Sequence, residues 1–341
     1  MRKQKWNALQ SFFCAFALLS VTACGQQSST APDNQNTPAA SSKQVKVGIV
    51  QIVEHPALDA AREGFIAQMA KNGYEKDKQV VYDVQSAQGE MNTAIQIAQK
   101  FQGDKVDLIL AIATPTAQAA AQTTKEIPIV FTAVTDPVAA GLVKSMEKPE
   151  GNVTGTTDMN PVEEQLALVK ELKPEAKTVG IIYNSGEVNS KVQVDAAKAV
   201  ADKLGLTIQE AAITSPTEVK QAAESMVGKV DAFYVPTDNM VVSSISAVLA
   251  VAEAQKIPVV AGEENSVKSG AIATYGIDYG KLGEQTADMA VKILKGEAKP
   301  ADMAVEKQAE MKLVINKKAA EKMGVTIPQA MLDRAAEVVE Q

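Results

Sequence analysis

The chain has 341 residues, of which 46% are apolar and 22% charged, so extensive disorder is excluded and two domains are expected. Its net charge of −7 argues against a protein that binds the phosphate backbone of nucleic acids. Two cysteines and one histidine exclude a disulfide scaffold, a cysteine-rich zinc site and any paired-histidine motif, and we expect neither metal nor cofactor.

Residues 1–23 are typical of a secretory signal peptide. Arg2, Lys3 and Lys5 precede a mostly apolar stretch over 8–21, which is shorter than the roughly 20 apolar residues of a membrane-spanning helix. The sequence Val-Thr-Ala-Cys at 21–24 resembles the lipobox of bacterial lipoproteins, in which the cysteine is acylated and becomes the new N-terminus. We therefore expect lipidation of Cys24, with an ordinary signal and a chance cysteine as the alternative.

Residues 24–44 follow as a segment rich in Ser, Gln, Asn, Ala and Pro, with almost nothing to bury. Such a composition predicts a flexible tether between the lipid anchor and a folded body. The body is then expected on the outer face of the cytoplasmic membrane.

From Val45 onward, short β-branched runs alternate with stretches of helical periodicity. The pattern predicts strands over 45–52, 80–84, 107–113 and 128–133, with helices over 57–72, over 91–101 and from Pro115. This rhythm is typical of a parallel, doubly wound α/β sheet.

The same landmarks then occur a second time. Residues 46–50 are echoed by 178–182, 106–110 by 230–234, and 127–130 by 257–260, at offsets of 132, 124 and 130 residues. Near-constant offsets indicate two similar lobes. We place the first lobe at 45–155, joined by parts of 276–341, and the second at 156–275.

Two β-rich segments bracketed by glycine, 151–157 and 270–278, are predicted to be crossing strands that serve as hinges between the lobes. A helix over 279–295 follows, then an extended piece over 311–315. Two small helices, over 317–323 and 328–339, are expected to close the chain.

Ligands of open α/β sheets bind beyond the carboxyl ends of the strands. Two such rims facing each other would make a cleft rich in hydroxyl, amide and carboxylate groups, suited to a polar zwitterion. The residues that follow the predicted strands are His55, Thr114, Thr116, Thr135, Asp136, Asn184, Glu187, Thr237, Asp238, Asn239, Glu263 and Asp278.

An α-carboxylate needs free N–H groups at a helix start together with hydroxyls, which residues 113–116 supply. An α-ammonium needs a carboxylate, for which Asp278 is the first choice and Asp238 and Glu263 are the others. The threonines at 114 and 116 and Asp278 could instead cap helices, Asp238 and Asn239 could be turn residues, and Glu187 could occupy the first turn of its helix.

An aromatic ring needs an apolar slot, and Tyr183, Tyr275 and Phe131 are expected near strand ends, where packing in the core is the alternative. His55 lies in a loop from which it can contact the ligand, although a surface histidine without function fits equally well.

Several ordered segments resemble those of the substrate-binding lipoproteins of ABC transporters, and most of all the branch assigned to tryptophan and tyrosine uptake in Gram-positive bacteria. The resemblance spans 45–315. The segments that carry it are His55–Asp59, Ala113–Ala119, Val134–Val138, Asn152–Gly155, Tyr183–Asn184, Pro236–Asn239 and Tyr279–Gln285.

The resemblance implies the type I periplasmic-binding-protein fold, with an amino acid held between two lobes and delivered to permease subunits with a cytoplasmic ATPase. The expected ligand is an aromatic amino acid, that is, tryptophan, tyrosine or phenylalanine. A monomer is expected. The sequence lacks the nucleophile and phosphate-binding motifs of common enzyme classes, which favours a binding protein over an enzyme. A sugar- or nucleoside-binding protein, a tethered sensor and a secreted enzyme stay open as alternatives.

Overall fold

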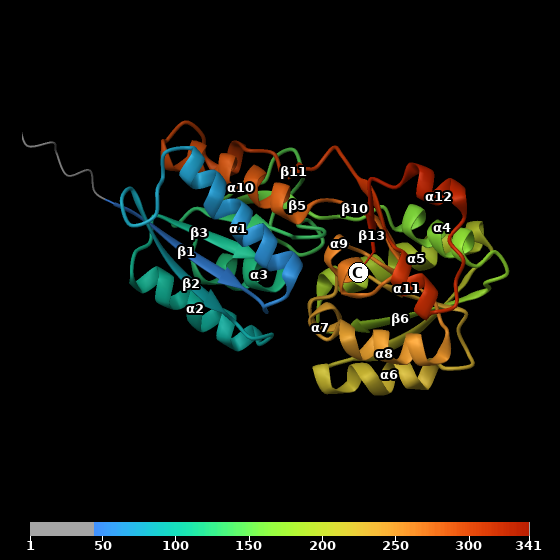
Figure 1. Cartoon of the computed structure of the whole chain (residues 1–341). Helices are drawn as coiled ribbons and strands as arrows, with labels where there is room; N and C mark the ends of the chain where they lie inside the picture. The colour runs from blue at the N-terminus through green and yellow to red at the C-terminus, as the bar shows by residue number, and fades with distance from the viewer. Residues whose placement is uncertain (1–43, 341) are drawn as a thin grey trace, which may run out of the picture. The chain divides into compact units, whose positions relative to one another are not determined.

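The computed structural model describes residues 44–340, which belong to one compact unit of the chain. The signal peptide, Cys24 and nearly all of the tether expected above lie outside the described residues. Two α/β lobes follow each other along the chain (Figure 1).

The first lobe is built around a parallel sheet in the order β2-β1-β3-β4-β5-β11. Its elements in chain order are β1 (Val45–Gln51), α1 (Pro56–Lys71), β2 (Val80–Ser86), α2 (Met91–Gly103), β3 (Leu108–Ile112), α3 (Thr114–Thr123), β4 (Ile129–Thr132), β5 (Val153–Thr157), α10 (Tyr279–Leu294), the 3-10 turn Pro300–Asp302 and β11 (Glu306–Lys307).

The second lobe repeats this plan in the order β7-β6-β8-β9-β10-β12-β13, with β12 antiparallel to β10. Its elements are α4 (Val162–Leu172), β6 (Thr178–Asn184), α5 (Val188–Ala201), the 3-10 turn Asp202–Leu204, β7 (Thr207–Ile213), the 3-10 turn Pro216–Glu218, α6 (Val219–Met226), β8 (Ala232–Val235), α7 (Asn239–Ser243), α8 (Ile245–Gln255), β9 (Val259–Ala261), α9 (Glu264–Ser269), β10 (Ala273–Gly276), β12 (Lys312–Asn316), α11 (Lys317–Lys322), α12 (Gln329–Arg334) and β13 (Glu337–Val339).

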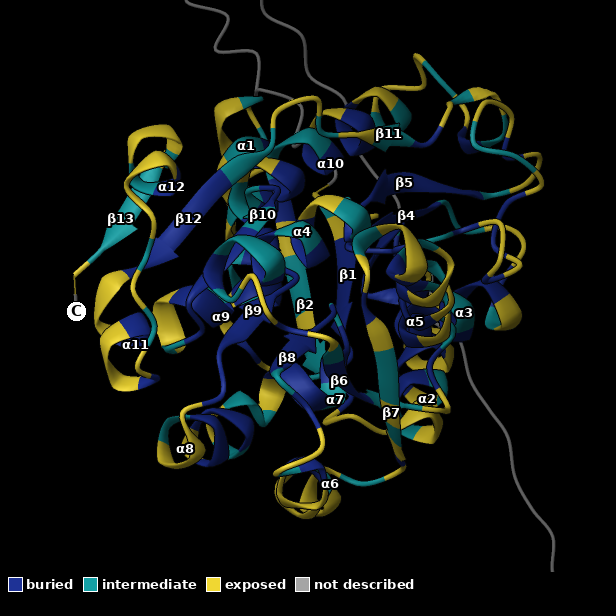
Figure 2. Cartoon of the chain, turned by 90° about the vertical axis from the view of Figure 1, so that its right-hand side faces the viewer, coloured by how far each residue is buried: buried dark blue, intermediate teal, exposed yellow. Residues whose placement is uncertain are grey.

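Burial explains why the central strands form. All five residues of β3 are buried, as are all four of β4 and of β8, because helices cover both faces of each sheet. Helix α1 instead buries one stripe, with Leu58, Phe65 and Met69 at helical spacing. Figure 2 shows the buried strands inside and the exposed outer faces of the helices.

The sequence repeat has a physical counterpart in the two lobes. In each lobe a glycine in the first strand makes room for a large side chain: a Cβ on Gly48 would lie 2.6 Å from the Phe101 ring, and one on Gly180 would lie 2.7 Å from the sulfur of Met226.

The two lobes also share a hydrogen bond at the start of the first strand. The carboxylate of Asp231 accepts a hydrogen bond from the backbone of Thr178 at the start of β6, and that of Asp107 accepts one from the backbone of Lys46 in β1. The prediction of two similar doubly wound lobes is confirmed.

The chain crosses between the two sheets three times, over 158–161, 277–278 and 308–311. The first two crossings follow β5 and β10, each of which stays within its own sheet, so the connecting segments are shorter than the expected hinge strands 151–157 and 270–278. The third crossing was not expected.

The C-terminal segment differs from expectation in two ways. Strands β12 and β13 extend the second sheet beyond the expected bounds 156–275, whereas α10 and β11 return to the first lobe. The helix expected over 328–339 ends at Arg334, and the β-branched residues Val338 and Val339 pair with β12 at the sheet edge.

Helices α1 and α10 lie side by side, although more than 200 residues separate them in sequence (Figure 1). Their approach depends on small residues, because a Cβ on Gly283 would lie 1.9 Å from the carbonyl oxygen of Ala61, and one on Gly64 would lie 2.1 Å from that of Gly280. These glycines therefore fix how closely the returning helix packs on the first lobe.

Replacing Gly283 by Ala should lower the free energy of unfolding by about 1–3 kcal/mol, because the two helices must separate to admit one methyl group. Chemical denaturation of the purified body measures this. Gly103→Ala is the matched control, since a Cβ there meets no atom within 4 Å, and it should be neutral or slightly stabilising. Equal stability of the two variants would contradict this account of the helix pair.

Candidate functional site

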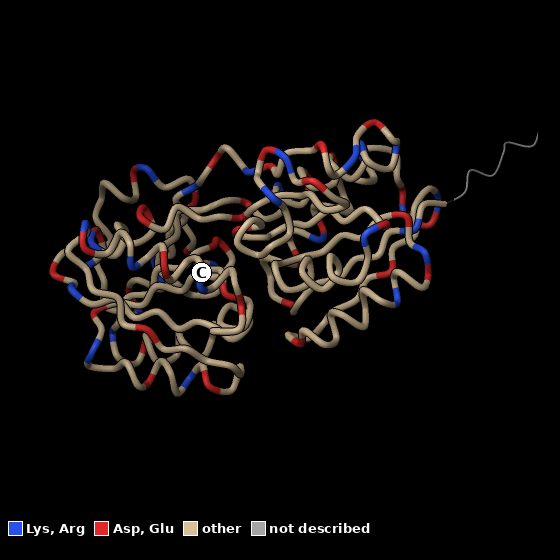
Figure 3. Tube along the Cα trace, turned by 180° about the vertical axis from the view of Figure 1, so that it is seen from behind, with Lys and Arg blue, Asp and Glu red and all other residues tan. Residues whose placement is uncertain are grey.

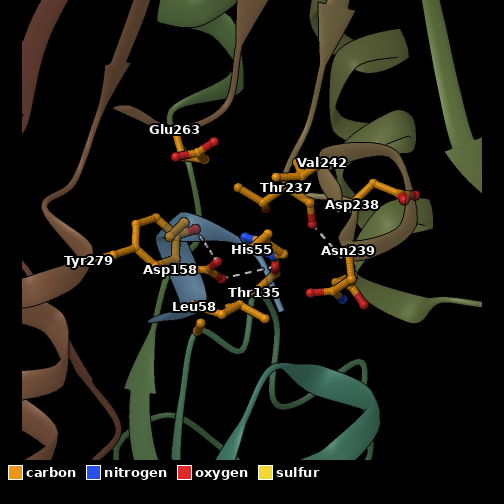
Figure 4. A pocket seen from close by; sticks show the side chains of 13 residues that line it. His55, Leu58, Thr135, Asp158, Thr237, Asp238, Asn239, Val242, Glu263 and Tyr279 are labelled. Atoms are coloured by element: carbon orange, nitrogen blue, oxygen red, sulfur yellow. Dashed lines mark hydrogen bonds between the residues drawn. The ribbon is translucent and has the colours of Figure 1, made fainter. Parts of the chain in front are cut away.

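A small cavity of about 10 Å³ lies where residues of both lobes meet. In this arrangement of the lobes, that volume is room for about one water molecule. It is lined by His55, Ala57, Leu58, Ala133, Thr135 and Tyr279 from the first lobe, Asp158 from the first crossing, and Asn189, Thr237, Asp238, Asn239, Val242 and Glu263 from the second lobe (Figure 4).

One side of the cavity is organised around Asp158. Its Oδ1 accepts a hydrogen bond of 3.0 Å from the Thr135 hydroxyl, and its Oδ2 accepts one of 2.6 Å from the Tyr279 hydroxyl (Figure 4). Burial raises the pKa of this carboxyl group, against the two hydroxyl hydrogen bonds, which lower it. Glu263 lies on the same side, where it caps α9 through the N–H groups of Asn265 and Ser266.

Asp238 and Asn239 lie on the other side (Figure 4). Asp238 caps α7 by accepting from the N–H of Val241 at 2.8 Å, and its second oxygen accepts from the N–H of Asn184 and the hydroxyl of Ser190, both at 2.6 Å. Burial raises the pKa of Asp238 as well. This carboxylate thus already accepts three hydrogen bonds from the protein.

Glu187 stands behind this side of the cavity, where it accepts hydrogen bonds from three side-chain amides, those of Asn184, Asn189 and Asn239. Burial and the neighbouring charge of Asp238 raise the pKa of Glu187 to about 7. It also lines an outer cavity of about 350 Å³ that adjoins the first one at Asn239. Met91 and Met240, from opposite lobes, line that outer cavity too.

The charge balance of the cavity is one-sided. Three carboxyl groups line it, all at most 4% exposed, and no lysine or arginine is among its lining residues. On the outside, by contrast, charges of both signs are spread over both lobes (Figure 3). Buried carboxylates without a cation are costly, so this cavity favours a ligand that brings a positive group.

The start of α1 offers the opposite polarity. His55 is the residue before the helix and makes no side-chain cap, and Pro56 occupies the first turn. Ala57 and Leu58 line the cavity, and their N–H groups belong to the turn of a 16-residue helix where no intrahelical partner exists. Such groups attract an anion such as a carboxylate.

Backbone strain accompanies the rim of the first lobe. Ala113 and Ala133 follow β3 and β4 and have φ of +81° and +56°, a region that residues with a Cβ rarely adopt. Ala133 lines the cavity. Strain of this kind concentrates at functional sites, where the surrounding structure over-determines the backbone.

Of the residues predicted from sequence, six line the cavity: His55, Thr135, Thr237, Asp238, Asn239 and Glu263. Asn184 and Glu187 line the outer cavity instead. Neither cavity is lined by Thr114, Thr116, Asp136, Tyr275 or Asp278.

Two of the residues outside the cavity, Thr116 and Asp136, hydrogen-bond to backbone groups close by in sequence. The Thr116 hydroxyl donates to the carbonyls of Ile112 and Ala113, so it closes its own helical turn. The carboxylate of Asp136 accepts from the N–H groups of Val138 and Ala139 in a turn. Thr114 is buried, and its hydroxyl has no partner.

Asp278, the first choice for an ammonium group, caps α10 through the N–H of Lys281 and pairs with Lys312 at 3.1 Å. Its position is therefore that of a structural cap. Tyr275 lies in β10 and lines a separate surface groove beside α4.

Seven lining residues were not among the predicted ones, and three of these have polar side chains: Asp158, Asn189 and Tyr279. Asp158 directly follows β5, so the same strand-end rule would have selected it had β5 been assigned to a sheet and not to a hinge. Asn189 and Tyr279 lie in the first turns of α5 and α10. They do not follow strands, so only the folded structure shows that they line the cavity.

The family model for ABC transporter substrate-binding proteins matches residues 46–339. The chain belongs to this family. It is therefore a solute-binding protein that acts outside the cytoplasm with an ABC transporter. Among residues 44–340, no helix is long and apolar enough to cross a membrane, and no group of acidic, cysteine or histidine side chains could hold a metal ion.

The chain is 49% identical, over 87% of its length and 86% of the relative, to a tyrosine-binding protein of Clostridioides difficile. It resembles a structure from Streptococcus pneumonia in complex with L-Trp, with a TM-score of 0.84 and 40% identity, covering 87% of this chain and all of the other.

A ligand-free, open structure of a substrate-binding protein with adhesive properties from Clostridium difficile matches with 49% identity over the same shares of the two chains. Its TM-score is only 0.66. The arrangement of the present chain is thus closer to that of the L-Trp complex, although the sequence is closer to the protein in the open structure.

The pKa of His55 is lowered to about 4, because the effect of burial is larger than the opposing attraction of the Asp59 carboxylate. Between pH 6.5 and 4, the unfolded chain takes up a proton that folded His55 refuses, so this residue lowers the free energy of unfolding as the pH falls through that range. Because the chain has one histidine, its imidazole resonance in a proton NMR titration reports this pKa directly.

We expect that resonance to titrate near pH 4, and the stability of His55→Gln to fall less steeply than that of the parent chain between pH 6.5 and 4. A midpoint between 6 and 7 would show that His55 is exposed to solvent.

Proposed function

We propose that this protein captures an aromatic L-amino acid, tyrosine or tryptophan, and delivers it to the permease of an ABC transporter. The observation that carries the proposal is the cavity in which Asp158 and two other buried carboxyl groups meet no basic side chain. The tyrosine-binding relative and the neighbour in complex with L-Trp support the choice of ligand.

In this proposal the α-ammonium group of the ligand binds on the side of Asp158 and Glu263. Asp158 has only two hydroxyl donors for its two oxygens, so it retains acceptor capacity for a charged donor. The ammonium would bring the positive charge that offsets the cost of burying the carboxylates.

The α-carboxylate of the ligand would bind the N–H groups of Ala57 and Leu58 at the start of α1. These donors need no basic side chain, which agrees with the absence of lysine and arginine from the lining. Leu58 and Val242, from opposite lobes, would contact the ligand through their apolar side chains. The body would act as a monomer, since one copy supplies both halves of this site.

Calorimetric titration with L-tyrosine and L-tryptophan tests the proposal. The described residues hold no tryptophan, so the fluorescence of bound L-tryptophan gives a second readout. Asp158→Asn should weaken binding by at least about thirtyfold, because the ammonium is then left without its charged partner, a loss of about 2–5 kcal/mol.

Asp278→Asn is the matched control, because Asp278 caps a helix outside the cavity. It should lower the melting temperature while leaving the affinity within about threefold of the parent. Binding of leucine, a sugar or a nucleoside without any aromatic amino acid would contradict the proposed function. An Asp278→Asn effect on affinity larger than that of Asp158→Asn would place the ammonium site elsewhere.

We further propose that Cys24 carries the lipid that anchors the protein to the outer face of the cytoplasmic membrane, as the lipobox at 21–24 predicts. Cys24→Ala should then leave the protein unprocessed or release it into the medium, as cell fractionation measures. Cys14→Ala, within the apolar part of the signal, is the matched control and should stay anchored. A cleaved Cys24→Ala protein that stays on the membrane would contradict lipidation.

A further inference from the structure

Asn189 lines the cavity with an amide whose orientation is fixed by its neighbours. Its Nδ2 donates to the carboxylate of Glu187 at 2.9 Å and to the carbonyl oxygen of Thr237 at 3.2 Å. Both partner atoms are oxygens that accept hydrogen bonds, one from a carboxylate and one from a backbone carbonyl. The amide nitrogen, and not the amide oxygen, must therefore point toward them. The Oδ1 of Asn189 is therefore the side-chain atom left without a partner in the protein.

That oxygen has no partner in the protein. Asn189 is 3% exposed, and its Oδ1 is buried without a hydrogen bond. A buried acceptor left without a donor is costly, and native proteins rarely leave one. Because Asn189 lines the cavity, the donor that completes it is expected from the bound ligand.

The ligand offers two kinds of donor, an ammonium and a polar hydrogen on the ring, and the two sides of the cavity differ in what they accept. Near Asn189, the carboxylates of Glu187 and Asp238 each already accept three hydrogen bonds from the protein. On the far side, Asp158 accepts only two, both from hydroxyls. The charged donor thus belongs with Asp158, and a neutral donor belongs with Asn189.

We propose that Asn189 is a specificity-determining residue whose Oδ1 accepts a hydrogen bond from the ring of the ligand, either the phenol O–H of tyrosine or the indole N–H of tryptophan. Phenylalanine has no such hydrogen and leaves the buried oxygen unpaired. Glu187 is the positioning residue, since it holds the Asn189 amide in this orientation. This inference rests on the proposed function and adds the basis of its selectivity.

The test is a calorimetric comparison of L-tyrosine, L-phenylalanine and 4-fluoro-L-phenylalanine, the last nearly matching tyrosine in size without a donor. The parent protein should bind tyrosine about 10–100 times more tightly than either analogue, as expected when one buried acceptor is left unpaired. Tryptophan should likewise be preferred over 1-methyl-L-tryptophan.

Asn189→Leu should weaken tyrosine binding and bring the affinities for tyrosine and 4-fluoro-L-phenylalanine within about threefold of each other. Glu187→Gln should also reduce this ratio. A glutamine amide can either accept or donate a hydrogen bond, so it no longer fixes which atom of the Asn189 amide points toward it. Asn72→Leu, at the far end of α1 and outside the cavity, is the matched control and should keep the ratio of the parent.

Equal affinities of the parent for tyrosine and 4-fluoro-L-phenylalanine would overturn the inference and leave the proposed function standing, even if Asn189→Leu does not fold. An equal loss for all ligands in Asn189→Leu would show that Asn189 binds the ammonium group and would overturn it too. Failure of every aromatic amino acid to bind would overturn the proposed function and this inference together.

Discussion

The burial of carboxyl groups where the two lobes meet is the constraint on which the rest of the structure depends. Asp158, Asp238 and Glu263 line one cavity, and burial raises the pKa of each. Asp238 and Glu263 are held by the first turns of α7 and α9, whose N–H groups offset part of the cost of desolvation. Asp158 relies on two hydroxyls, so it depends most on what the cavity binds.

The duplicated fold supplies this arrangement from both sides. In each lobe the carboxyl ends of parallel strands face the other lobe, so the loops after β4 and β8 bring Thr135 and Asp238 to the same cavity. The three crossings connect the lobes beside it, and Asp158 lies within the first of them. A carboxylate in a crossing segment accepts hydrogen bonds from Thr135 and Tyr279 of the first lobe. In the proposed function, a ligand bound to Asp158 would therefore contact a segment that bends when the lobes move.

Much of the fold followed from the sequence, because buried parallel strands leave a continuous apolar run and the two lobes repeat the same landmarks. The site was harder to predict, because the residue types that bind a zwitterion also cap helices. Asp238 and Glu263 cap helices and also line the cavity, whereas Asp278 caps α10 and pairs with Lys312 outside the cavity. Only the packing of the two lobes separates these cases. Tyr279 shows the same limit, since its hydroxyl reaches Asp158 across 121 residues of sequence.

The most direct test of the central claim is a crystal structure of the body with L-tyrosine bound. The account predicts the ammonium group within about 3 Å of the Asp158 carboxylate, the ligand carboxylate at the first turn of α1, and the phenol oxygen within about 3 Å of Asn189 Oδ1, the usual hydrogen-bond distance. A ligand bound in the reverse direction, with its ammonium group at Asn189 and its ring against Asp158, would contradict the account.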